Sequence, residues 1–159
     1  MLKLNGQDFT TGRATFLDRL PTDAEPTAKI YLKLRPGELE ATILAQLDTG
    51  SAWSVLAPDI AQAVGLRSET GEPKKLSARG LIFDGHLVRV PVLILADEGD
   101  SLEVTATVFI SNDWPAGKNF IGYSGLLESI RIALDPQSND FYFGAAQARD
   151  SLMGISETD

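Results

Sequence analysis

The sequence contains no cysteine, and its only histidine is His86. Without cysteine the chain has no disulfide framework, no thiolate zinc site and no cysteine nucleophile. One histidine and scattered acidic residues also provide no ligand cluster for a catalytic zinc ion. We therefore expect a protein without a metal or any other cofactor, and the composition permits a reducing compartment.

Basic residues and long apolar runs are scarce as well. The 159 residues carry 14 Lys and Arg against 22 Asp and Glu, a net charge of -8, and no basic cluster suited to binding phosphates. The longest apolar run, residues 90–96, is far too short to span a bilayer, and residues 1–8 lack the apolar core of a signal peptide. We expect a cytoplasmic protein that binds neither nucleic acid nor a membrane.

With 43% apolar residues, a chain of this length fits one compact domain. Residues 1–27 are polar and contain two prolines, so we expect an irregular N-terminal arm with a short strand at Leu2–Leu4. The domain itself is expected over residues 28–144. Residues 145–159 are expected to form a polar C-terminal tail that frays.

Alternating apolar and polar residues predict a mostly β domain. The alternation on either side of Pro36-Gly37 predicts a first hairpin over residues 30–45. A second hairpin is predicted from strands at 76–82 and 86–95, with Phe83-Asp84-Gly85 as its turn because Asp-Gly readily takes positive φ angles.

Three more strands are predicted at residues 102–110, 131–134 and 141–143. The acidic segment between Asp97 and Asp100 lacks a full calcium-binding loop, so it is interpreted as a solvated hairpin end.

Two short helices are predicted among these strands. Pro58 suits the first turn of a helix that Gly65 ends, and Ser124 is interpreted as the cap of a second helix reaching Ile130. The order of strand, Gly-containing turn and short helix thus occurs twice, over residues 43–64 and 120–130. This repetition indicates a small all-β domain with pseudo-twofold character.

The segment Leu47-Asp48-Thr49-Gly50-Ser51 follows a predicted strand and carries the candidate chemistry. A loop at the end of a strand can present the Asp48 carboxylate. Gly50 is expected to let the backbone bend so that amides point at the Asp48 oxygens. Thr49 offers a hydroxyl that can donate to a carbonyl across a close interface.

The Asp-Thr-Gly-Ser segment, the helix after it and the later Phe120-Ile121-Gly122 before a second helix resemble the retropepsin-like aspartic proteases over residues 28–144. The resemblance implies a closed β-barrel of the acid protease fold with one or two short helices. It also implies that Asp48 is catalytic, that the hairpin around Phe83-Asp84-Gly85 is a flap over the substrate, and that Ile121-Gly122 packs beside the active loop.

Two positions depart from the pattern of the viral members of that family. Those proteins usually have an Asp shortly after the first glycine and an Arg directly after the second, where this chain has Ala52 and Tyr123. Because the Asp and Arg side chains pair with each other, losing both leaves no unpaired buried charge. The interface near the site must still differ from the viral pattern.

Peptide hydrolysis by this route needs two carboxylates that share one proton. The sequence has no second Asp-Thr-Gly or Asp-Ser-Gly, so the second carboxylate is expected from Asp48 of another copy across a twofold axis. The expected partners are therefore a second copy of the chain and a peptide or protein substrate. Residues expected to contact the substrate are Ala52, Gly80, Leu81, Ile82, Phe83 and Ile121.

The sequence supports other functions and roles less well. His86 and Ser124 do not form a convincing serine hydrolase triad, because Gly122-Tyr123-Ser124-Gly125 lacks the spacing of a nucleophile elbow. Trp53 and Trp114 flank the two motifs and are interpreted as packing residues rather than subsite walls. The alternative function is a dimeric module of the same fold that binds extended peptides without cutting them.

Overall fold

The computed structural model describes residues 1–146. Of the tail expected over residues 145–159, all but Ala145 and Ala146 lie outside the described residues. The strands are β1 (Lys3–Leu4), β2 (Gln7–Asp8), β3 (Gly12–Thr15), β4 (Tyr31–Pro36), β5 (Ile43–Leu47), β6 (Ser54–Val55), β7 (Glu72–Ala78), β8 (Leu81–Ile94), β9 (Glu98–Gly99), β10 (Leu102–Ile110), β11 (Phe120–Ile121), β12 (Ile130–Asp135) and β13 (Asp140–Ala145). The helices are α1 (Pro58–Val64) and two 3-10 turns, η1 (Ser68–Thr70) and η2 (Leu127–Ser129). Within residues 1–146, no helix has the length and apolar character needed to cross a membrane.

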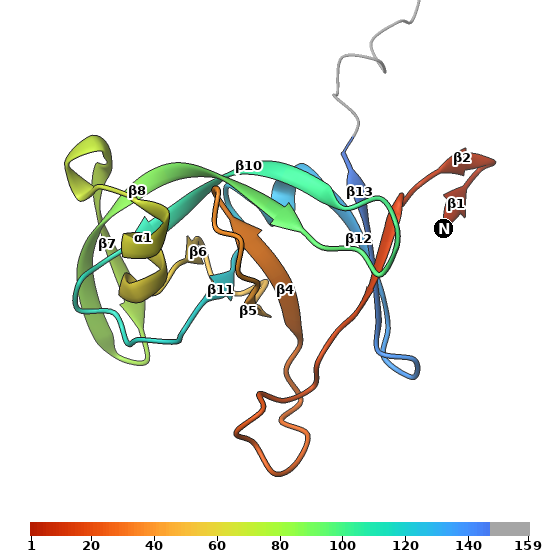
Figure 1. Ribbon diagram of the computed structural model, residues 1–159, viewed down its shortest axis with the longest axis horizontal. Helices are drawn as coiled ribbons and strands as arrows, with labels where there is room; N and C mark the ends of the chain where they lie inside the picture. Colours follow the sequence, from red (N-terminus) through yellow and green to blue (C-terminus); the bar gives the residue numbers. More distant parts are fainter. Residues whose placement is uncertain (147–159) are drawn as a thin grey trace, which may run out of the picture.

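Six strands close into a barrel, in the order β10, β6, β11, β5, β4 and β8, with β8 pairing back onto β10. β7 pairs only with β8 and lies outside this ring. Figure 1 shows β7 at one end of the molecule and β3, β12 and β13 at the other. The expected all-β barrel with a short α-helix is confirmed.

The alternation read from the sequence corresponds to the buried face of the barrel. Leu32, Leu34 and Ala45 are at most 3% exposed, and Val90, Val92 and Ile94 on β8 are at most 2% exposed. β10 covers the predicted range of residues 102–110. The first hairpin is also confirmed, since β4 and β5 pair in antiparallel fashion on either side of Pro36-Gly37.

The turn of the second hairpin was placed wrongly by the sequence. β7 and β8 are joined by Arg79 and Gly80, whose φ angles of 52° and 76° are those of a two-residue hairpin turn. Phe83, Asp84 and Gly85 lie inside β8 instead, paired with residues 74–76 of β7. Gly85 is required for close packing, because a Cβ there would lie 2.2 Å from the carbonyl oxygen of Ile110.

The first predicted helix is confirmed, and the prediction of a second helix is wrong. α1 begins at Pro58 and ends before Gly65, which has a left-handed φ of 78°. After β11 there is only the three-residue turn η2, without a side-chain cap from Ser124. Ser124 is held in a strand-like bridge to Trp53 instead, so it is not free to start a helix.

The N-terminal segment has the expected short strand, as β1, but residues 12–15 form a further strand where an irregular arm was predicted. β3 pairs with β13 and with β9 in a four-stranded sheet of order β12, β13, β3, β9. Ala14 of β3 and the adjacent Phe16 are buried in the same apolar cluster as Phe141 and Phe143. The small size of Gly12 and Ala14 hid this strand, because the segment has little apolar alternation.

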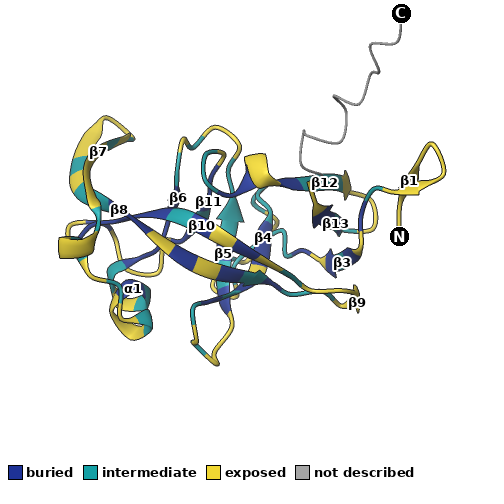
Figure 2. Cartoon of the chain, turned by 90° about the horizontal axis from the view of Figure 1, so that it is seen from above, coloured by how far each residue is buried: buried dark blue, intermediate teal, exposed yellow. Residues whose placement is uncertain are grey.

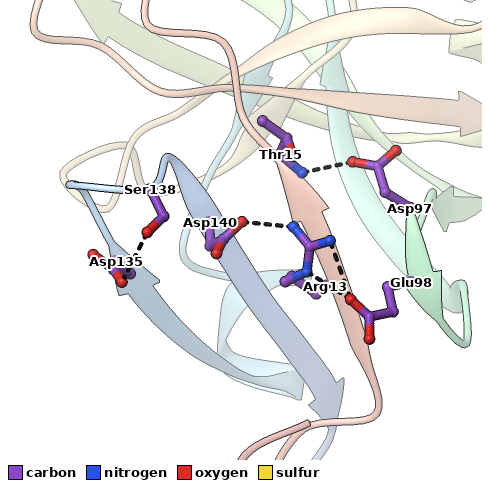
Figure 3. Close-up of polar contacts among 7 residues, drawn as sticks. All are labelled: Arg13, Thr15, Asp97, Glu98, Asp135, Ser138 and Asp140. Atoms are coloured by element: carbon purple, nitrogen blue, oxygen red, sulfur yellow. Dashed lines mark hydrogen bonds and ion pairs between the residues drawn. The ribbon is translucent and has the colours of Figure 1, made fainter.

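Polar contacts join β3 to its two neighbours (Figure 3). Arg13 donates to Asp140 of β13 at 2.6 Å and to Glu98 of β9 at 3.1 and 3.2 Å. The carboxylates, above all Asp140, raise the pKa of Arg13. The acidic segment at Asp97 is therefore not simply a solvated turn, since its carboxylate also accepts the Thr15 amide at 2.7 Å.

Candidate active site

The Asp48 loop is positioned by two neighbouring strands of the barrel. β5 pairs in parallel with β11, with Leu47 opposite Ile121. The Asp48 amide continues this ladder by donating to the Ile121 carbonyl at 2.9 Å. The loop therefore leaves the barrel where β5 and β11 end side by side, with the amide of its first residue bonded to β11.

The Asp48 carboxylate is half-buried and points back over its own loop. Its Oδ1 accepts the Gly50 amide at 3.0 Å, and the Ser51 amide donates to the Asp48 carbonyl at 3.1 Å. The Gly50 amide thus points at an Asp48 oxygen, as expected, and the Gly50 φ angle does not lie in the left-handed region. A Cβ at Gly50 would sit 3.3 Å from Oδ1, so the glycine keeps that oxygen accessible.

The other predicted loop residues adjoin Asp48 in different settings. Thr49 and Ala52 are exposed, and Ser51 is half-buried with its hydroxyl donating to the Trp53 carbonyl at 2.8 Å. The Thr49 hydroxyl forms no hydrogen bond within residues 1–146. It therefore remains available for the interface contact expected from the sequence.

The loop after β11 is bonded to the Asp48 loop through the backbone. The Tyr123 amide donates to the Ser51 carbonyl at 2.9 Å, and the Ser124 amide donates to the Ala52 carbonyl at 2.8 Å. These bonds join the two segments that an Asp–Arg pair connects in the viral pattern. The Tyr123 side chain is 55% exposed beside them.

Two buried polar residues of the site were missed by the sequence reading. The Ser54 hydroxyl, 3% exposed, accepts the Gly122 amide at 2.9 Å. The Asn119 side chain, 8% exposed, accepts the Ala57 amide at 2.8 Å. A Cβ at Gly122 would lie 2.2 Å from the Trp53 carbonyl carbon, so this glycine allows the two loops to touch. No pattern of spacing distinguishes Ser54 or Asn119 from ordinary loop residues.

Ile121 does not line an open site in the described residues. Its side chain is 1% exposed and belongs to the barrel core. Its contribution is the carbonyl that accepts the Asp48 amide. The predicted substrate contact of Ile121 is corrected to a structural role, because alternation along β11 turns this side chain inward.

The hairpin of β7 and β8 projects beyond the barrel, and its tip is largely exposed (Figure 2). Gly80 lies in the turn, and Leu81 and Ile82 follow it with 61% and 70% exposure. Phe83 packs edge-on against Trp114 at a ring distance of 4.9 Å. Because side chains alternate along a strand, Leu81 and Phe83 share the inner face, and Ile82 points the other way.

The aromatic residues near the hairpin serve mainly as packing. Trp114 is 9% exposed, stacks edge-on between Phe83 and Phe120, and donates its indole N–H to the Lys118 carbonyl at 2.7 Å. The packing interpretation is thus confirmed for Trp114. Trp53 is half-buried.

A hollow of about 1010 Å³ lies between α1, the base of the hairpin and residues 110–116. Its lining includes His86, Asp84 and Ser111 but not Asp48. None of residues 48–53 lines this hollow, although Lys74 does. In residues 1–146, no group of three or more His, Asp or Glu side chains is placed to hold a metal ion.

No protein-family model matches the sequence, and no curated protein matches it. Among solved structures, the chain is similar to a retropepsin-like aspartic protease from Rickettsia conorii, with a TM-score of 0.53, 16% identity, and coverage of 86% of this chain and 93% of that chain. It is also similar to the retroviral protease-like domain of Ddi1 from Leishmania major, with a TM-score of 0.45, 17% identity, and coverage of 77% and 97%. The first similarity shows that this chain has the retropepsin-like fold, which confirms the resemblance read from its motifs at the level of the fold.

Proposed function

We propose that this chain is an aspartic endopeptidase that acts as a homodimer, with one Asp48 carboxylate from each copy. The observation that carries the proposal is the Asp48 loop itself. In a retropepsin-like fold, a half-buried carboxylate stands at the joined ends of β5 and β11 and accepts the Gly50 amide at 3.0 Å. A carboxylate supported in this way is ready to act on a water molecule.

One copy supplies only one such carboxylate, because the sequence contains a single Asp-Thr-Gly. A twofold axis beside the loop brings a second Asp48 to the first, and the two carboxylates then share one proton. The ionised carboxylate takes a proton from water as the oxygen attacks the peptide carbonyl carbon. The protonated carboxylate donates to the carbonyl oxygen, which forms a tetrahedral diol.

Exposed residues around the loop support a second copy and a peptide as partners. Thr49, Ala52 and Tyr123 are all exposed next to Asp48 in the single chain. The inner face of the hairpin offers Leu81 and Phe83 to apolar side chains of an extended peptide, and the backbone around Gly80 offers hydrogen bonds to it.

The proposal is tested with unfolded casein between mildly acidic and neutral pH, with and without a statine-type inhibitor. We expect inhibitor-sensitive cleavage that declines as the pH rises, because the shared proton is then lost. Asp48→Asn is expected to abolish cleavage and to leave a dimer in sedimentation, since the amide keeps the shape of the carboxyl group. Asp59→Asn, on an exposed position of α1, is the control that retains activity.

A mixing experiment tests the shared site directly. Adding an equal amount of D48N to a fixed amount of wild-type protein, followed by refolding together, is expected to leave about half of the original activity. Random pairing places the other wild-type chains in dimers with a single carboxylate. Activity unchanged by D48N, or cleavage retained by D48N alone, would overturn the shared site.

The same fold also serves a dimeric module that binds extended peptides without cutting them, and the exposed Leu81 on the inner face of the hairpin favours peptide contact in either case. The two functions separate in the casein assay. Peptide binding by wild-type protein without inhibitor-sensitive cleavage would identify the binding module.

A further inference from the structure

A basic side chain lies beside the candidate site and takes no part in the proposed mechanism. Lys74 of β7 places its Nζ 5.8 Å from the centroid of the Trp53 ring. Trp53 ends the Asp48 loop, where its carbonyl accepts the Ser51 hydroxyl and its backbone bridges to Ser124. The Lys74 ammonium therefore lies over the ring of the residue that ends the Asp48 loop.

Lys74 and Lys75 lie on opposite faces of the hairpin. Leu76, two residues after Lys74, packs with Trp53 against the cluster around Phe109 and Trp114, so this face of β7 turns toward the barrel. Lys75 lies on the other face, where its Nζ is 2.8 Å from Asp84. Side chains of both lysines are exposed, but only Lys74 adjoins the Asp48 loop.

Lys74 forms no ion pair with an acidic side chain in the described part of the chain. Among residues 1–146, the ion pairs involve Lys3, Arg13, Arg19 and Lys75, and none involves Lys74. The hairpin over residues 72–85 has three basic and two acidic side chains, whereas the whole chain has a net charge of -8. Lys74 is thus a basic side chain without an ion-pair partner in residues 1–146 of an acidic chain, with Glu72 on the same face of β7.

We propose that Lys74, held over Trp53, is a specificity-determining residue that binds an acidic side chain of the substrate. This inference rests on the proposed peptide-cleaving function. An extended peptide between the hairpin and Asp48 passes the Trp53 ring, which offers an apolar surface to the methylene groups of Glu. The peptide carboxylate then meets the ammonium, and the acidic remainder of the protein disfavours such a carboxylate elsewhere.

The test uses pairs of otherwise identical peptides with Glu or Gln at each of the three positions on either side of the cleaved bond. For wild-type protein we expect kcat/KM at one position to be about two- to fivefold higher for Glu than for Gln, the upper part of the range of an exposed ion pair. The ratio is expected to fall toward one at high salt because such a pair is screened. Lys74→Gln is expected to give a ratio of about one, and Lys74→Glu to invert it.

Lys75→Gln is the matched control, because Lys75 is the adjacent residue with the same charge on the opposite face. It is expected to keep the wild-type ratio and the wild-type rate on Gln peptides. A Glu preference that survives in K74Q, or disappears equally in K75Q, overturns the inference.

Binding to the D48N protein separates failure of the inference from failure of the proposed function. The same peptides are titrated against D48N and D48N/K74Q, with Trp fluorescence as the readout. Tighter binding of Glu peptides by D48N alone supports the Lys74 site even if the wild-type protein cuts nothing. Cleavage by the wild-type protein with no Glu preference in rate or binding leaves the protease standing and removes the Lys74 site.

Discussion

Replacing Ser54 by Ala tests whether a single buried hydroxyl holds the two loops of the candidate site together. The hydroxyl is 3% exposed and accepts the Gly122 amide at 2.9 Å. Alanine has no side-chain acceptor. The volume left by the missing hydroxyl oxygen is smaller than a water molecule needs, so water cannot replace that acceptor. The Gly122 amide is then buried without a partner.

The expected cost follows from the burial of that amide. A buried donor left without an acceptor lowers the free energy of unfolding by about 1–3 kcal/mol. For a domain of this size each kcal/mol corresponds to roughly 2–4 °C in Tm, so the melting temperature is expected to fall by roughly 2–12 °C.

The measurement is urea unfolding of wild-type and S54A proteins, followed by circular dichroism at a constant pH. Ser77→Ala is the control, because Ser77 is exposed on β7 and its loss is expected to change the free energy of unfolding by at most about 0.5 kcal/mol. Hydrogen exchange reports the same bond locally. We expect faster exchange of the Gly122 amide in S54A than in S77A.

The reasoning is refuted by an S54A protein with the unfolding free energy and m-value of S77A. It is also refuted if the Gly122 amide exchanges as slowly in S54A as in the wild-type protein. Either result would mean that Gly122 finds another acceptor, and that Ser54 does not position the loop after β11.

Two further predictions concern ionisable groups. Burial, supported by the charge of Asp23, raises the pKa of Tyr31. The unfolded chain therefore loses this proton at a lower pH than the folded protein, and the free energy of unfolding of the wild-type protein is expected to decline as the pH rises above about 10. Urea unfolding is expected to show a smaller decline for Tyr31→Phe. An equal decline in both proteins would contradict the assignment. Arg13→Gln removes the contacts to Glu98 and Asp140 and is expected to lower the Tm at low salt, with a smaller difference at high salt. Arg89→Gln, on an exposed position of β8, is its control, and equal Tm values for the two variants at low salt would exclude a stabilising role for Arg13.

The barrel was predictable because its strands obey simple rules. One face of β4, β5, β8 and β10 is buried, so apolar residues recur at every second position and mark the strands. α1 was predictable because Pro58 and Gly65 occupy the ends that these residues favour.

The turn of the second hairpin was predicted at the wrong position, because Asp84-Gly85 is a sequence typical of tight turns. Gly85 is there to let β8 pass close to Ile110, a long-range contact that local sequence does not reveal. The real turn uses Arg79 with a positive φ, which is uncommon for a residue other than glycine. β3 was missed for a related reason, since its pairing with β13 is visible only in three dimensions.

The candidate site was predictable as far as its motif extends. Asp48, Thr49, Gly50 and Ser51 form one loop, and the pairing of Leu47 with Ile121 brings the second motif beside it. The roles of Ser54 and Asn119 were not predictable, because the sequence does not show whether a polar residue is buried or exposed. Their importance depends on which backbone amides the fold leaves without acceptors.

The sheet of β12, β13, β3 and β9 has a consequence for the order in which the protein is made. Residues 12–15 pair with residues 140–143, so their hydrogen bonds form only after almost the entire described chain has been synthesised. Until then β3 has only the short strand β9 as a neighbour, and Ala14 and Phe16 lack their contacts with the cluster that contains Phe141 and Phe143. Pairing over such a sequence separation is slow, so the β3–β13 ladder is expected to form late in folding.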